Sequence, residues 1–252
     1  MLSTEKIDGT LIVTMRWLSK RNAIGPDEAK TLSDAISEGD DGEVTAMILT
    51  GEGAFSSGGD LPTFAKISKE SSEDDIRERV YGDVQGILRA LRSIKVPTIA
   101  AVDGPAIGLG MDIALACDMR FVGPDGYLRQ GWASAGLIPA LGGAAFMSRL
   151  APWQVWSQIV EQPKVDATMA FANGIGEIGL PTAFDAALLR AQGLRTMGRD
   201  VLLDYVKVVR PLHWPNSEYF KECSEIQAHR IKSDRFRSFA EQVLSTSRNQ
   251  PK

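Results

Sequence analysis

Short apolar runs recur along the first half of the chain, and stretches with helical spacing follow them. The runs at 9–15, 45–50 and 98–102 predict buried strands. Apolar residues at helical spacing predict one helix after Pro26 and another over 74–93. Strands that each lead into a helix are typical of an α/β fold.

The pattern changes after about residue 150, where helical spacing dominates, as over 185–209. This change predicts two parts: an α/β core over 1–195 that carries the site, and a helical C-terminal region over 196–252. No low-complexity block or long linker separates the two parts.

A glycine-rich loop follows the second apolar run and ends in Gly58-Gly59-Asp60. Adjacent glycines let the backbone turn sharply and bring a free N–H group close to a ligand, and Asp60 can cap a helix that starts near Pro62. Pro62 and the polar run that extends through 71–75 suggest a mobile surface segment that could serve as a lid. A Gly-Gly-Asp turn alone is more often structural.

A second loop, over 103–112, leaves the third strand and opens a helix over 113–118. The free N–H groups at a helix start carry the positive end of the helix dipole, which suits a developing oxyanion. Gly108 and Gly110 lack the third glycine of a dinucleotide-binding fingerprint, and the chain has no Walker-type Gly-Lys-Ser/Thr.

Composition narrows the class of protein. The 252 residues are 44% hydrophobic and 24% charged, and the net charge of -4 argues against a nucleic-acid partner. Cys117 and Cys223 lie far apart with no neighbours at metal-ligand spacing, so we expect neither a disulfide framework nor a metal site. No window reaches the roughly 18 apolar residues of a membrane span, and the first residues lack a signal-peptide pattern. We expect a cytoplasmic protein with no membrane partner.

These motifs resemble the signature of the enoyl-CoA hydratase/isomerase (crotonase) superfamily. The signature resemblance lies in 97–104, Gly108-x-Gly110, the acidic residue two positions on, and 116–118. Segments 20–24, 55–61 and 136–143 agree with the family in order and spacing, and the resemblance spans roughly 10–150. It implies a ClpP/crotonase spiral of ββα units with a helical C-terminal trimerisation region.

The resemblance also implies a site. A thioester carbonyl would lie between the backbone N–H groups of Gly59 and Leu109, which would stabilise an enolate-like intermediate. Losing one such donor costs on the order of 3 kcal/mol of barrier. The residues expected to contact coenzyme A are Lys20, Arg21, Ala23, Ser57, Gly59, Asp60 and Leu61.

Two positions depart from the hydratases of this family, which use two glutamates. The first position holds Asp112, and the second, counted from the turn at 136–139, holds Trp132. An indole cannot act as a general acid or base, and aspartate is one methylene shorter than glutamate. Asp112 would thus be the only retained acid/base, Trp132 would line the acyl pocket, and the Leu109 side chain would narrow it.

A tryptophan at this position is similar to 4-chlorobenzoyl-CoA dehalogenases, but their nucleophilic aspartate is replaced here by Ala140. Two interpretations stay open. The first is an enzyme that uses Asp112 alone, as a hydratase of altered activity, an isomerase, a thioester hydrolase or a decarboxylase. The second is a catalytically impaired acyl-CoA-binding protein.

The resemblance further implies a homotrimer or hexamer in fatty acid metabolism, with an acyl-CoA thioester as partner. Coenzyme A enters as part of the substrate, and no cofactor or metal is expected. We expect a structural role for Asp118, and packing or subunit contacts for Trp153, Trp156 and Trp214. His213 and His229 lack the neighbours of a Ser/His/Asp triad.

Overall fold

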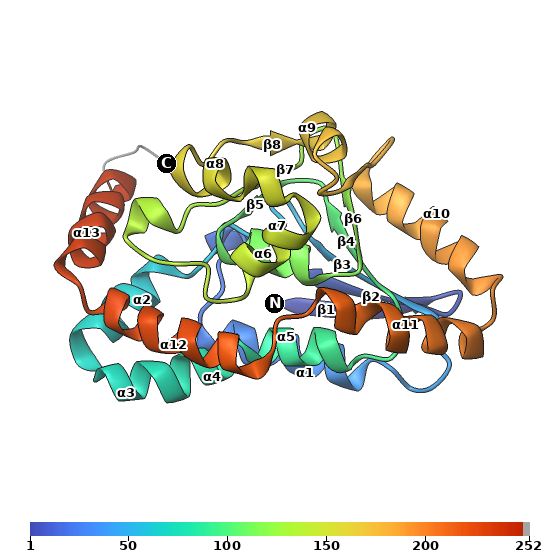
Figure 1. The fold of residues 1–252 in the computed structure, drawn as a ribbon, viewed down its shortest axis with the longest axis horizontal. Helices are drawn as coiled ribbons and strands as arrows, with labels where there is room; N and C mark the ends of the chain where they lie inside the picture. Colours follow the sequence, from blue (N-terminus) through green and yellow to red (C-terminus); the bar gives the residue numbers. More distant parts are fainter. Residues whose placement is uncertain (249–252) are drawn as a thin grey trace.

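The computed structural model describes residues 1–248, and its centre is a six-stranded sheet (Figure 1). The strand order is β1-β2-β3-β4-β6-β9. β1 pairs antiparallel with β2, and the other neighbouring strands of this sheet pair in parallel. The bounds are β1 Leu2–Ile7, β2 Thr10–Met15, β3 Ala46–Gly51, β4 Thr98–Val102, β6 Met119–Val122 and β9 Glu177–Ile178.

A second, three-stranded sheet stands beside the first, in the order β5-β7-β8. Its strands are β5 (Pro105–Ile107), β7 (Tyr127–Arg129) and β8 (Val165–Asp166). β5 leads directly into helix α6 (Leu109–Ala116). The small sheet therefore fixes the place where α6 begins, since only Gly108 lies between the two elements.

Helices cover both faces of the large sheet. Alternate residues of β3 point to opposite faces: Ala46 and Ile48 pack in a cluster with α10 (Ala183–Arg195), whereas Met47 and Leu49 join the main core. Helices α1 (Pro26–Glu38) and α5 (Gly86–Ser93) pack against each other in that main core. The α/β core expected from the sequence is thus confirmed.

The remaining helices fall into two groups. Helices α2, α3, α4, α7, α8 and α9 lie between the strands along the chain, and α11, α12 and α13 follow α10 and form the C-terminal region (Figure 1). Their bounds are α2 Leu61–Glu70, α3 Glu73–Asp75, α4 Tyr81–Val84, α7 Gly143–Leu150, α8 Val155–Val160, α9 Ala167–Ala172, α11 Arg199–His213, α12 Ser217–Ile231 and α13 Asp234–Arg248. A π-helical segment spans Ile76–Val80, and 3-10 turns span Leu18–Lys20, Ala133–Ala135 and Pro152–Gln154.

Two segments differ from the sequence prediction. The helix predicted over 74–93 is divided into α3, the π-helical segment, α4 and α5. Gly82 and Gly86 fall inside this stretch, and glycine weakens a helix interior. The segment interpreted as a possible lid begins with helix α2, which is anchored because the buried Ser68 hydroxyl donates to the Ile231 carbonyl at 2.7 Å.

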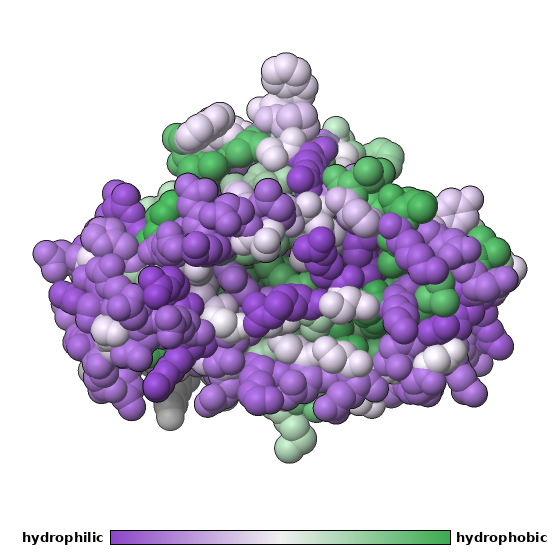
Figure 2. Space-filling model, turned by 60° about the horizontal axis from the view of Figure 1, so that its bottom comes forward, coloured by the Kyte–Doolittle hydropathy of each residue, from purple (hydrophilic) through white to green (hydrophobic). Residues whose placement is uncertain are grey.

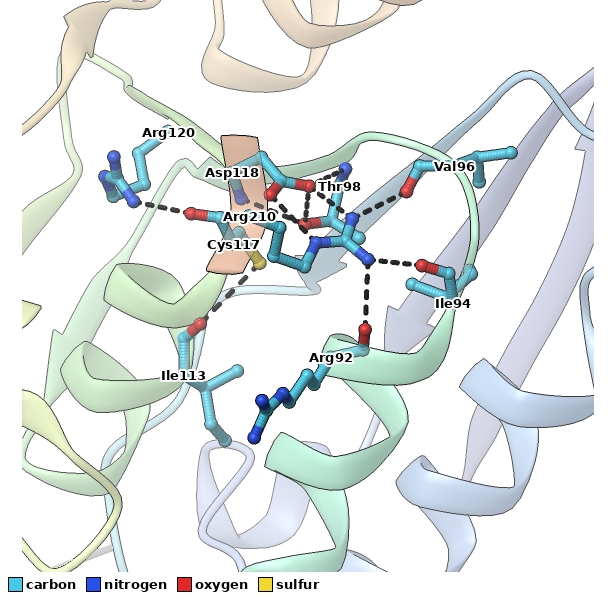
Figure 3. Close-up of polar contacts among 9 residues, drawn as sticks. All are labelled: Arg92, Ile94, Val96, Thr98, Ile113, Cys117, Asp118, Arg120 and Arg210. Carbon is cyan, nitrogen blue, oxygen red and sulfur yellow. Dashed lines mark hydrogen bonds and ion pairs between the residues drawn. The ribbon is translucent and has the colours of Figure 1, made fainter. Parts of the chain in front are cut away.

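Helix α11 is fastened to the sheet by Arg210, which is only 4% exposed (Figure 3). Its guanidinium donates to both carboxylate oxygens of Asp118, at 3.0 and 2.6 Å, and to the Val96 carbonyl at 2.8 Å. Asp118 also accepts from the backbone N–H and the hydroxyl of Thr98, both at 2.8 Å. Asp118 therefore has the structural role that we expected.

Hydrophobic side chains are unevenly spread over the surface. The face in Figure 2 is mostly hydrophilic, with hydrophobic residues in recesses and toward its upper edge. Trp153 and Trp156 are 94% and 75% exposed, whereas Trp214 is buried with its ring edge-on to Phe146. Within residues 1–248, no helix is both long enough and apolar enough to cross a membrane.

Candidate functional site

A cavity of about 500 Å³ lies beside the start of α6. It is lined by nine residues that the sequence placed in a site, which come from four separate stretches of chain. These are Lys20, Arg21, Ala23, Ser57, Gly59, Asp60, Leu61, Leu109 and Trp132. The structure does not place Asp112 in this wall.

Backbone hydrogen bonds hold the first two stretches together. The Ile24 N–H donates to the Gly58 carbonyl at 2.8 Å, and the Asp60 N–H donates back to the Ile24 carbonyl at 3.0 Å. Ser57 is tied in the same way, because its N–H donates to the Arg21 carbonyl at 3.0 Å. Segment 20–24 and loop 56–60 therefore form one rigid wall.

The amide groups of Gly59 and Leu109 are free to bind a ligand. Leu109 is the first residue of α6, so its N–H has no partner within the helix. In the parallel bridge between Ile24 and Gly59, the hydrogen bonds are made by the neighbours of Gly59. Across residues 1–248, neither N–H donates a hydrogen bond to the protein.

Glycine is required where these two segments meet. Gly58 has a φ of +103°, and a Cβ there would lie 2.9 Å from the Ile107 carbonyl oxygen and 3.9 Å from the Leu109 nitrogen. A Cβ on Gly110 would lie 2.7 Å from the Ser56 carbonyl oxygen. Because larger residues would force the loop and the helix apart, the glycines allow both free amides to face one cavity.

Lys20 and Arg21 differ in their charge environment. The Lys20 ammonium lies 2.7 Å from Glu28 and 2.7 Å from Asp60. Burial lowers the pKa of Lys20, but hydrogen bonds to the two carboxylates outweigh it and raise the pKa above its usual value. Arg21 is exposed at the cavity and forms no ion pair within the described chain. Arg21 is therefore the available cation at this wall.

In addition to its ion pair with Lys20, Asp60 makes a second contact. Its carboxylate accepts from the Thr63 N–H at 3.5 Å, and it stands at the N-cap of α2. The structure thus confirms the cap expected from the sequence, and the same carboxylate fixes the position of Lys20.

The Asp112 carboxyl is fully buried, and Trp132 separates it from the cavity. The Trp132 indole N–H donates to Asp112 Oδ2 at 3.1 Å, and the Gln130 amide donates to Oδ1 at 3.5 Å. Burial raises the pKa of Asp112 well above its usual value, although these hydrogen bonds oppose the rise. Trp132 lines the cavity, and Asp112 lies outside the lining.

Several cavity residues were not found from the sequence. Phe64 and Tyr81 line the wall from α2 and α4, and Phe236 and Phe239 line it from α13. Phe64 closely follows the first glycine loop along the chain, whereas Tyr81, Phe236 and Phe239 lie far from both glycine loops. Only the apolar spacing in the last helix could have indicated one of these distant residues. The C-terminal region beyond residue 195 therefore helps to form the site.

Comparison with known proteins decides the family. The sequence model described as "Enoyl-CoA hydratase/isomerase" matches residues 5–184. The chain belongs to this family. Among curated relatives, "Probable enoyl-CoA hydratase EchA14" of Mycobacterium tuberculosis is 31% identical over 221 residues, which cover 86% of this chain and 83% of that protein. The "Short-chain-enoyl-CoA hydratase" of Clostridium acetobutylicum is 32% identical over 160 residues, 62% of this chain and 59% of that protein.

Solved structures agree with the fold of this enoyl-CoA hydratase/isomerase family member. An enoyl-CoA hydratase from Bacillus halodurans has a TM-score of 0.86 at 19% identity, covering 96% of this chain and 99% of that one. An enoyl-CoA hydratase/isomerase from Mycobacterium paratuberculosis has a TM-score of 0.85 at 19% identity, covering 96% and 97%. The crotonase-like fold class expected from the sequence is confirmed.

One feature sets this family member apart from the two-glutamate pattern. The two positions that the resemblance assigned to catalytic glutamates hold Asp112 and Trp132, and these two side chains bind each other. The indole N–H is thus used inside the protein and is not available to a ligand. The side chains at these two positions are therefore joined by an internal hydrogen bond.

Proposed function

We propose that this enzyme binds an acyl-CoA thioester in the cavity and polarises its carbonyl between the N–H groups of Gly59 and Leu109. The observation that carries the proposal is the pair of free amide donors at one cavity wall. Such donors stabilise an enolate oxygen as its charge develops, and one of them can contribute about 3 kcal/mol. Coenzyme A is part of the substrate, and this step needs no further cofactor.

The wall formed by segments 20–24 and 57–61 is the proposed coenzyme A site. Among residues 1–248 the Arg21 charge has no ion-pair partner, which suits a phosphate group, whereas Lys20 is held by two carboxylates. Ala23, Ser57 and Leu61 line the same wall and would contact the rest of the coenzyme.

Asp112 is the proposed acid/base, and the reaction is of the hydratase/isomerase type through a thioester enolate. One carboxyl group can remove a proton from one carbon and return it to another, which is what an isomerase requires. Hydration needs a water molecule to be positioned as well, and Trp132 offers no second carboxylate for this. Isomerisation therefore fits the residues better, with the indole moving aside to admit the carboxyl.

A second candidate function is acyl-CoA binding without turnover. It is favoured by the closed position of Asp112, which is 0% exposed and hydrogen-bonded to Trp132. Thioester hydrolysis or decarboxylation would use the same two amides. We also propose that the protein assembles as a homotrimer or hexamer in the cytoplasm, which the exposed hydrophobic side chains of Trp153 and Trp156 support.

Turnover separates these candidates. The wild type, Asp112→Asn and the control Asp27→Asn, a change at an exposed carboxylate on α1, are incubated with 2-enoyl- and 3-enoyl-CoA substrates of several lengths. We expect conversion by the wild type and the control, and a loss of at least about a hundredfold in Asp112→Asn. Equal rates in all three proteins would exclude Asp112 as the acid/base. Binding without conversion in any of them would favour the second candidate.

A further inference from the structure

An aromatic side chain lies beside each of the two free amides. A Cβ placed on Gly59 would lie 3.2 and 3.4 Å from Cε2 and Cδ2 of the Phe64 ring. A Cβ placed on Gly108, which precedes Leu109, would lie 3.7, 3.9 and 4.0 Å from Cε2, Cδ2 and Nε1 of the Trp132 indole. Both glycines and both aromatic residues line the cavity. A ligand carbonyl bound to the two amides would therefore have a protein ring close to it on each side.

Both rings are held in place by the protein. The three indole atoms lie at nearly equal distances from the Gly108 position, so a face of the indole covers that glycine. The indole N–H also donates to Asp112 at 3.1 Å. Phe64 lies on α2, whose Ser68 hydroxyl is bonded to α12 at 2.7 Å. Because the rings are already ordered, a ligand that packs against them has little conformational entropy to remove.

The charged and the apolar parts of the cavity wall come from different segments. The charged lining residues all belong to the proposed coenzyme A wall and are Lys20, Arg21 and Asp60. Away from that wall the described lining carries no charged side chain, and three further aromatic residues contribute to it: Tyr81, Phe236 and Phe239. An acyl group that ends in a carboxylate would lose its hydration there without gaining a partner. The acyl part of the cavity thus suits an uncharged group.

We propose that this part of the cavity selects acyl groups with an aromatic ring close to the thioester carbonyl, and that Phe64 and Trp132 contact that ring. This inference rests on the proposed acyl-CoA function and names its substrate class. Aromatic rings attract each other edge-to-face or when stacked with an offset, and one such pair adds about twofold to tenfold in affinity beyond the burial of apolar area. A saturated ring of similar size buries similar area and lacks this attraction. Phe64 is accordingly a specificity-determining residue.

The test measures binding by titration calorimetry for two pairs of ligands, with hexanoyl-CoA as the reference. The pairs are benzoyl-CoA with cyclohexanecarbonyl-CoA, and phenylacetyl-CoA with cyclohexylacetyl-CoA. Each pair compares an aromatic ring with a saturated ring on the same acyl chain. We expect the wild type to bind the aromatic member of at least one pair about tenfold more tightly than the saturated member.

Replacing Phe64 with leucine removes one ring and keeps an apolar side chain. The variant should lose more affinity for the aromatic member than for the saturated one, so that the preference falls to about threefold or less. The change is made at Phe64 because Trp132 also binds Asp112, the proposed acid/base. Phe171→Leu is the matched control and should keep the whole preference, since Phe171 is 63% exposed and lies outside the cavity lining.

The outcomes separate this inference from the proposed function. If the wild type binds hexanoyl-CoA but prefers neither aromatic ligand over its saturated counterpart, the inference is wrong and the proposed function stands. The same holds if Phe64→Leu keeps the full preference of the wild type. Should Phe64→Leu fail to fold, the comparison within the wild type decides alone. If neither hexanoyl-CoA nor any of the ring ligands binds, both are wrong.

Discussion

At the scale of single residues, the hydrogen bond between Trp132 and Asp112 shapes the site most. It joins the two positions where the resemblance expects carboxylates, and it keeps the Asp112 carboxyl away from the cavity. Gly143 packs directly against this carboxyl, since a Cβ on Gly143 would lie 1.9 Å from Asp112 Oδ1. The pocket around Asp112 is thus fitted to its size, with no room for a longer side chain on that side.

The raised pKa of Asp112 predicts a pH-dependent stability. In the folded protein this pKa lies above the unfolded value of about 3.9, so the folded state binds more protons between the two values. The stability contributed by the protonated group is present below about pH 4 and is lost as pH rises toward the folded pKa. Asp112→Asn removes this loss.

We therefore expect the free energy of unfolding of Asp112→Asn to increase relative to that of the wild type as pH rises from about 4 to 7, so that the variant becomes comparatively more stable. Urea denaturation at several pH values measures this difference. A constant difference over that range would contradict the raised pKa, and Asp27→Asn should show no such trend because Asp27 is exposed.

At the scale of elements, the site depends on where helices begin and where they are fastened. α6 begins directly after β5, and loop 56–60 is bonded to segment 20–24, so the two free amides are carried by well-supported backbone. The C-terminal helices close the cavity from another side through α13. α11, which leads toward them, is fixed to the sheet by Arg210 (Figure 3).

Replacing Arg210 with leucine should destabilise the protein strongly. The change leaves Asp118 without its cationic partner and frees the carbonyl of Val96, and breaking a buried pair costs about 3–5 kcal/mol. Arg190→Leu is the matched control, because its ion pair with Glu177 has side chains 39% and 44% exposed and should contribute less than about 1 kcal/mol. Urea denaturation compares the two, and equal losses would contradict the structural role of Arg210.

At the scale of the whole molecule, local sequence patterns predicted the central strands and the glycine loops. They did not predict which distant helices would line the cavity. The apolar runs indicated β2, β3 and β4 because strands buried on both faces are nearly continuous hydrophobic segments. The glycine loops marked two places where the backbone could approach a ligand, and the family resemblance then pointed to the amides of Gly59 and Leu109. The α/β class followed from the apolar runs, and the crotonase-like fold followed from the resemblance.

What the sequence could not show depends on long-range contacts. Trp132 binds Asp112 because the chain folds back between these two positions, which are 20 apart in the sequence. Helix α13 lines the cavity because of packing across the whole molecule. The break in the predicted helix over 74–93 brings Tyr81 to the cavity, and helical spacing gives no sign of it. These three features arise from contacts between residues that are distant in the sequence, so local sequence patterns do not indicate them.

The central claim is that two backbone amides polarise a thioester, and proline at position 109 tests it most directly. Proline is tolerated at the first position of a helix, so Leu109→Pro removes the N–H group while α6 can still begin there. Leu109→Ala removes the side chain and keeps the N–H, which makes it the matched control. The measurement is kcat/KM of both variants on the best substrate of the wild type, with folding checked by circular dichroism.

The account predicts that Leu109→Pro loses about a hundredfold to a thousandfold in kcat/KM relative to Leu109→Ala, because one of the two oxyanion donors is gone. The infrared band of a bound acyl-CoA carbonyl should move back toward its position in water in the proline variant alone. Equal activity in two folded variants, with the carbonyl band unchanged, would contradict the account.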